Sequence, residues 1–124
     1  MKKLQNKVAV ITGGNSGIGL ATAKLFAEEG AKVAITGRNK TTIDEAVFEI
    51  GNAAIGVVSD VSDIKNIDKT YLTVKDTFGK IDVLVVNAGV FIAAPLADFT
   101  EEMFDQTSDI NFKGVFFTIQ KALP

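Results

Sequence analysis

The sequence contains no cysteine and no histidine, and each absence excludes a class of chemistry. Without cysteine the chain can form neither a disulfide framework nor a thiolate zinc site. Without histidine it lacks the most versatile metal ligand and general base in proteins. We therefore expect no metal site and no Ser-His-Asp catalysis.

Excess charge of one sign and long apolar runs are missing as well. Thirteen lysine and arginine residues against fifteen aspartate and glutamate residues give a formal charge of -2, and no basic run of the kind that neutralises nucleic-acid phosphates occurs. No stretch approaches the roughly 18 uninterrupted apolar residues of a membrane span, and residues 1–7 carry charge without an apolar leader segment. We expect a cytoplasmic protein that binds neither nucleic acid nor membrane.

What the sequence does have is a regular alternation of short apolar runs with helical patterns. Hydrophobic residues make up 47% of the 124 residues, which is enough to bury the core of one domain. Runs rich in β-branched residues predict strands at 8–11, 33–36, 54–58 and 81–86. Glycines and capping residues predict helices from Ile18 to Gly30, from a Thr41 or Thr42 cap to Gly51, from a Ser62 cap over 64–78, and over 100–122.

This alternation predicts the fold class. Parallel strands joined by helices of ten or more residues need crossover connections, so we expect an α/β fold with a parallel, doubly wound sheet and helices on both faces. The almost unbroken apolar run 81–86 predicts a strand that is buried on both faces. No repeat, low-complexity tract or linker occurs, so we expect residues 1–124 to form a single domain.

A glycine-rich loop joins the first strand to the first helix. In Gly13-x-x-x-Gly17-x-Gly19, we expect Gly13 to end the strand with a tight turn, Gly17 to let backbone approach a diphosphate, and Gly19 to let the helix pack close to the sheet. The helix N–H groups then face the anion with the positive end of the helix dipole behind them. Between a strand and a helix, this pattern favours a dinucleotide site over a turn that needs φ > 0 without a ligand.

Residues at the carboxyl ends of the next two strands predict which cofactor binds. Gly37 and Arg38 stand where a carboxylate would bind the ribose 2′-hydroxyl of NAD. A glycine leaves room for a 2′-phosphate and Arg38 can offer it a bidentate fork, which favours NADP(H) over NAD(H). The alternative for Arg38 is a solvated surface charge. Asp60 either faces the ligand at the edge of the sheet or starts a turn to Asp63.

Several segments together resemble the short-chain dehydrogenase/reductase family: residues 12–19, Asp60-Val61, Asn87-Ala88-Gly89 and Asn111. The resemblance covers essentially the whole chain and implies a Rossmann-like fold. It implies that Asp60 and Val61 hold the adenine, that residues 87–89 run beside the cofactor, and that Gly37 with Arg38 selects NADP(H). The cofactor-binding residues that it implies are Gly13, Asn15, Ser16, Gly17, Ile18, Gly19, Gly37, Arg38, Asp60, Val61, Asn87, Ala88 and Gly89.

The resemblance also implies a reaction, the transfer of hydride between a nicotinamide and a carbonyl or alcohol substrate. Asn111 is similar to the catalytic helix asparagine of the family, which holds a water for a proton relay; otherwise it bends or solvates its helix. The family's catalytic Ser and Tyr-x-x-x-Lys segment has no counterpart here. The resemblance therefore implies that residues 1–124 are an NADP(H)-binding Rossmann domain that is incomplete at the C-terminus after the fourth βα unit, and that the isolated chain is inactive.

Tyr71 and Lys75 have the same Tyr-x-x-x-Lys spacing, which places both side chains on one helix face. They lie in the predicted helix 64–78, an outer crossover in the resembled fold. Their spacing alone does not bring them to the carboxyl edge of the sheet, where the nicotinamide would lie. We therefore interpret the two residues as a surface or packing pair.

Two features predict association with another polypeptide. In the resembled sheet order, 3-2-1-4, the apolar strand 81–86 has an unpaired edge, and apolar residues of the helix 100–122 lie on more than one face. We expect the chain to self-associate or to be completed by further polypeptide. The alternative to an oxidoreductase is a nucleotide-binding or regulatory module without catalysis that is complete at 124 residues.

Overall fold

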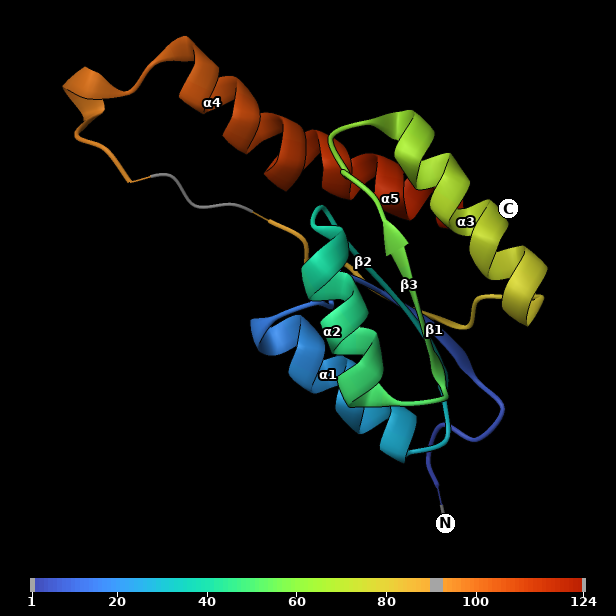
Figure 1. Ribbon diagram of the computed structural model, residues 1–124. Coiled ribbons are helices and arrows are strands. Elements are labelled where there is room, and N and C mark those ends of the chain that lie inside the picture. The colour runs from blue at the N-terminus through green and yellow to red at the C-terminus, as the bar shows by residue number, and fades with distance from the viewer. Residues whose placement is uncertain (1, 90–92, 124) are drawn as a thin grey trace.

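The computed structural model describes residues 2–89 and 93–123, and these form a four-stranded parallel sheet with helices on both faces (Figure 1). The strand order is β3-β2-β1-β4, so Val10 in β1 pairs with Ala34 in β2 and with Leu84 in β4. The predicted Rossmann-like, doubly wound fold and its strand order are confirmed. The strands are β1 (Val8–Thr12), β2 (Lys32–Gly37), β3 (Ala54–Val58) and β4 (Val83–Val85).

The helices divide between the two faces of the sheet. α1 (Gly17–Glu28) and α2 (Lys40–Ile50) lie side by side on one face, whereas α3 (Ile64–Phe78) lies on the other with α5 (Val115–Ala122) packed against it (Figure 1). α4 (Glu101–Ser108) leads into α5 through a π-helical segment, η2 (Asp109–Gly114). The predicted helical stretch 100–122 is therefore present, with one widened turn at its centre.

The core follows the strand period of two. Ile11, Val33 and Ile35 pack with residues of α1 and α2, whereas Val10 and Ala34 pack toward α3. Because neighbouring residues of β1 and β2 point to opposite faces, helices on both sides bury all of β1 and residues 33–36 of β2. The carboxyl ends of these two strands therefore stand on a closely packed framework.

Two predicted helix caps are wrong. The cap of α2 is Asn39, whose Oδ1 accepts a hydrogen bond from the Thr42 backbone N at 3.2 Å, and Thr41 and Thr42 already lie inside the first turn. The cap of α3 is Asp63 and not Ser62. Asn39 and Asp63 are the residues with extended backbone directly before each helix, and that conformation decides which polar side chain can cap.

The fourth strand is shorter and more exposed than its sequence predicts. β4 pairs only with residues 9–11 of β1, and its residues are half-buried, which corrects the expected strand 81–86 buried on both faces. Strand pairing ends where the neighbouring strand ends, however apolar the flanking residues are. Between strand 81–86 and the helical stretch 100–122 the sequence predicts a loop through Pro95, and this loop falls partly outside the described residues. None of the helices in the described ranges combines the length and apolar character that a bilayer crossing requires.

Candidate functional site

A cleft of about 630 Å³ opens at the carboxyl ends of the strands. Such an edge, where connections leave a parallel sheet to opposite faces, is where open α/β sheets bind ligands. Ten of the residues implied by the resemblance line it: Gly13, Asn15, Ser16, Gly37, Arg38, Asp60, Val61, Asn87, Ala88 and Gly89. Gly17, Ile18, Gly19 and Asn111 do not line it.

The glycine loop has the backbone geometry that its sequence predicts. Gly13 and Gly17 have φ of +67° and +56°, a region that side chains disfavour. Nothing lies within 4 Å of the place where a Gly17 side chain would begin, whereas a side chain at Gly19 would collide with the Gly13 carbonyl oxygen. Gly17 therefore leaves the start of α1 open, and Gly19 lets α1 pack against the loop.

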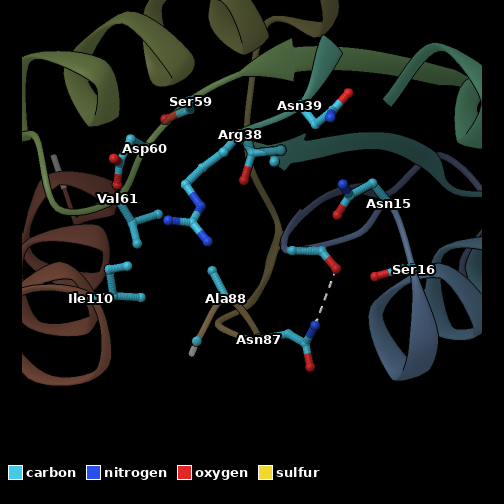
Figure 2. A pocket seen from close by; sticks show the side chains of 14 residues that line it. Asn15, Ser16, Arg38, Asn39, Ser59, Asp60, Val61, Asn87, Ala88 and Ile110 are labelled. Atoms are coloured by element: carbon cyan, nitrogen blue, oxygen red, sulfur yellow. Dashed lines mark hydrogen bonds between the residues drawn. The ribbon is translucent and has the colours of Figure 1, made fainter. Parts of the chain in front are cut away.

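A threonine that the sequence did not single out joins the glycine loop to the end of β4. The buried Thr12 Oγ1 accepts hydrogen bonds from the backbone N of Asn87 at 2.9 Å and of Ala88 at 3.0 Å. The Asn87 Nδ2 donates to the Gly13 carbonyl oxygen at 3.2 Å, drawn dashed in Figure 2. These three bonds fix the segment after β4 beside the turn after β1. Thr12 is the first residue of the segment 12–19 that carries the resemblance, although it is not among the cofactor-binding residues that the resemblance implies.

Arg38 follows β2 and extends into the cleft. Figure 2 shows its guanidinium between Val61 and Ala88, at the centre of the cavity. It forms no ion pair with any carboxylate in the described part of the chain. The side chain therefore presents an uncompensated, multidentate donor group to whatever fills the cleft.

Asp60 lines the cleft and starts the turn to Asp63, so the turn is present and the binding of a ligand by Asp60 stays a prediction. Its Oδ1 accepts hydrogen bonds from the backbone N and the Oγ of Ser62, at 3.0 and 2.7 Å, and its carbonyl oxygen accepts from the Asp63 backbone N at 3.0 Å. Its other carboxylate oxygen takes part in neither Ser62 contact. The neighbouring Val61 is buried.

Four further residues line the cleft that sequence reasoning missed: Thr36, Asn39, Ser59 and Ile110. Thr36, Asn39 and Ser59 lie at or after the ends of β2 and β3, so their position was the available signal. The buried hydroxyl of Thr36 has no hydrogen-bond partner among the described residues. No sequence pattern places Ile110, because it reaches the cleft only through the packing of η2.

Asn111 lies in η2, next to the cleft but outside its lining. Its Oδ1 is 3.1 Å from the position that a Gly89 side chain would occupy, so the amide faces the end of the 87–89 segment. Single π-helical turns often occur at functional sites because they widen a helix locally. This placement is compatible with the role that the resemblance implies.

Tyr71 and Lys75 lie away from this cleft, beside a smaller cavity of about 200 Å³ between α3 and α5. The Tyr71 hydroxyl donates a hydrogen bond to the Thr118 carbonyl oxygen. Burial raises the pKa of Tyr71 to about 12, the opposite of the lowered pKa that a proton-transfer tyrosine needs. The pair is therefore placed as a packing pair, as its position in the sequence predicts.

Comparisons with known proteins bear on this site. An oxidoreductase of Sarocladium schorii is 43% identical over 124 residues, and an uncharacterized oxidoreductase of Staphylococcus aureus strain MW2 is 37% identical over 125. Both alignments cover 100% of this chain but only 50% and 54% of those proteins. The chain thus spans about half the length of the curated relatives it matches.

Solved structures give the same result. The structure described as 3-ketoacyl-(acyl-carrier-protein) reductase from Brucella melitensis complexed with NADH superposes with a TM-score of 0.95 at 38% identity, covering 98% of this chain and 51% of that one. A short-chain dehydrogenase/reductase of the same organism, described as glucose/ribitol dehydrogenase, gives 0.95 at 34% identity, covering 100% and 54%. The family model for short chain dehydrogenases matches residues 7–124. The chain therefore belongs to the short-chain dehydrogenase/reductase family, whose members bind a nicotinamide cofactor.

Proposed function

We propose that the cleft binds NADP(H) and that the chain provides the cofactor-binding part of an oxidoreductase. The observation that carries this proposal is the combination of an open glycine loop at the start of α1 with an unpaired Arg38 reaching into the same cavity. The residues fit such a group: Gly13 lines the cleft with a positive φ, Gly17 leaves the start of α1 open, and the buried Thr36 hydroxyl lacks a protein partner among the described residues.

In this proposal each part of the cleft has a separate task. The backbone N–H groups at the start of α1 hold the diphosphate, and Arg38 holds the 2′-phosphate. Asp60 and Val61 border the adenine, and Asn87, Ala88 and Gly89 run beside the cofactor. The hydrogen bonds from residues 87 and 88 to Thr12 keep that segment in place before any ligand arrives.

The proposed reaction is hydride transfer between the nicotinamide and a carbonyl or alcohol carbon. The cofactor supplies the hydride chemistry, and the protein supplies binding, orientation and a proton donor. Asn111 is proposed to hold a water in a proton relay. Tyr71, the single tyrosine of the sequence, is bonded to the Thr118 carbonyl and is not placed to protonate a substrate at the cleft. We therefore propose that the 124-residue chain alone does not turn over substrate.

A second candidate is a nucleotide-binding or regulatory module without catalysis. The placement of Tyr71 outside the cleft favours it, because this chain offers no other tyrosine as an acid. Oxidation of NADPH with a panel of carbonyl substrates separates the two candidates. Turnover by the chain would contradict the proposal of a non-catalytic module. The oxidoreductase proposal would be contradicted if the cofactor binds but neither the chain nor any longer protein that contains it turns over substrate.

Calorimetric titration with NADPH and NADH tests the binding proposal. We expect NADPH to bind more tightly, and Arg38→Ala to weaken NADPH by roughly tenfold to a hundredfold while NADH changes little, since each charge-assisted bond contributes about 1.5–3 kcal/mol. The control is Lys40→Ala, because Lys40 is a nearby cation that pairs with Asp44 at 2.7 Å and does not line the cleft. Equal affinity for the two cofactors would contradict the role of Arg38, and absence of binding would contradict the site.

A further inference from the structure

The space beside Gly37 is filled by another residue of the cleft. A side chain starting at Gly37 would meet the Cγ, Nδ2 and Oδ1 of Asn15 at 2.8, 2.8 and 3.0 Å. Three nearly equal distances mean that the amide of Asn15 lies flat against Gly37. The glycine therefore makes room first for Asn15, and an acidic residue at position 37 would collide with it.

Thr42 holds this amide from outside the cleft. The Asn15 Nδ2 donates a hydrogen bond to the Thr42 Oγ1 at 2.8 Å, and that hydroxyl donates to the Asn39 carbonyl oxygen at 3.0 Å. A hydroxyl has one hydrogen, so Thr42 can only accept from Asn15. This fixes which end of the amide faces α2, and Figure 2 shows the nitrogen of Asn15 on the side of Asn39 and the oxygen turned away from it.

The Asn15 nitrogen retains one N–H after its bond to Thr42, because a carboxamide has two. The amide of Asn15 lies against Gly37, the residue directly before Arg38 at the end of β2. In open α/β sheets this strand end is where the protein recognises the group at the ribose 2′ position of the cofactor. A neutral donor at this place is compatible with a phosphate, whereas a carboxylate of the same shape would repel it.

We propose that Asn15 determines the preference for NADP(H) together with Arg38, and that Thr42 is the positioning residue that holds Asn15 in its selective orientation. This inference rests on the proposed function and deepens it. In it, the amide of Asn15 takes the place where an acidic residue at position 37 would select NAD(H), and its remaining N–H donates to the 2′-phosphate.

The test measures the ratio of NADPH to NADH affinity by calorimetry in the purified protein and its variants. Thr42→Val removes the hydroxyl at constant shape and leaves the Thr42 backbone N on the Asn39 cap, and we expect the ratio to fall about threefold to tenfold. Thr42→Ser keeps the hydroxyl and is expected to restore the ratio. Asn15→Asp is expected to lower the ratio more than about tenfold and to favour NADH.

Thr41→Val is the matched control, because Thr41 is exposed, lies on the same helix and does not line the cleft. Thermal unfolding checks that the variants remain folded, and a general loss of stability would lower both affinities without changing their ratio. If the wild type prefers NADPH but Thr42→Val and Asn15→Asp keep the wild-type ratio, the inference is wrong and the proposed function stands. If the wild type binds neither cofactor, the proposed function is wrong and the inference falls with it.

Discussion

The two strands that pair with β1 differ sharply in their surroundings. β2 lies between β1 and β3, and Val33, Ala34 and Ile35 are fully buried, with helices on both faces. β4 lies at an edge and is half-buried. Gly37 and Arg38, at the end of β2, form one wall of the cleft, and residues 87–89, which follow β4, form another. The wall at β2 is therefore closely packed, whereas the wall at β4 is held by a few hydrogen bonds.

The same contrast extends to the helices. α1 and α2 cover one face of the sheet and expose three large apolar side chains, those of Ile18, Leu25 and Phe48, whereas the run from α4 to the C-cap of α5 exposes five. These five residues are Phe104, Phe112, Phe116, Ile119 and Leu123. Contiguous exposed apolar surface usually marks a contact site in a soluble protein. We propose that the packed half carries most of the stability and that the run from α4 to α5 carries association.

The largest effect expected from this contrast is on the free energy of unfolding. Val33→Ala in β2 and Val85→Ala in β4 delete the same atoms, but Val33 is 0% exposed and Val85 is half-buried. We expect Val33→Ala to cost about 2–3 kcal/mol, from lost burial plus the cavity, and Val85→Ala about 1 kcal/mol. Urea unfolding followed by far-ultraviolet circular dichroism measures both, since the sequence has no tryptophan. Equal costs would show that β4 is packed as well as β2.

The second prediction concerns association, which we propose takes place between copies of this chain. Phe112 and Phe116 are 75% and 55% exposed, and we expect the double variant Phe112→Ser and Phe116→Ser to weaken self-association by about tenfold or more. Sedimentation velocity over a range of concentrations measures it. Phe48→Ser is the control, because Phe48 is 90% exposed but lies on α2 in the packed half. A wild-type protein that stays monomeric at high concentration contradicts this proposal.

The contrast also explains how much of the fold could be predicted from sequence. β1 and β2 are short, β-branched apolar runs, each with a glycine at or directly after its end, and these two signals predicted their place. The predicted strand 81–86 is longer than β4. Hydrophobicity indicates which residues can be buried, whereas the length of β4 depends on how many residues of β1 pair with it. The caps Asn39 and Asp63 were missed because several polar residues compete within one turn and only the backbone conformation decides between them.

The cleft was predictable where one local segment makes it and unpredictable where two segments meet. The turns at Gly13 and Gly17 are local, and their positive φ follows from the motif. The contact of Asn15 with Gly37 joins a loop after β1 to the end of β2, and its anchor Thr42 lies in the next helix. A sequence alone does not contain the distance between these segments, so Gly37 was interpreted as room for a phosphate alone.

The smallest effect is expected at the tether between the two regions. The Asp82 Oδ2, just before β4, accepts a hydrogen bond from the Val8 backbone N at 2.8 Å and pairs with the Lys80 Nζ at 3.0 Å. The Val8 N–H, and then Lys80, hold the pKa of Asp82 below its usual value. Because the folded pKa is the lower one, the carboxylate stabilises the fold above its unfolded pKa of about 4, and this contribution is lost as the pH falls through the folded pKa.

Asp82→Asn should therefore destabilise the protein at neutral pH, and its difference from the wild type should shrink in acid. Urea unfolding at a series of pH values measures this difference. Asp44→Asn is the control, because Asp44 pairs with Lys40 within α2 and ties no two segments together. The expected effect is modest, because an accessible ion pair is screened by solvent. A difference that stays constant down to the acid limit would mean that the charge contributes nothing and that the amide disturbs β4 by its shape alone.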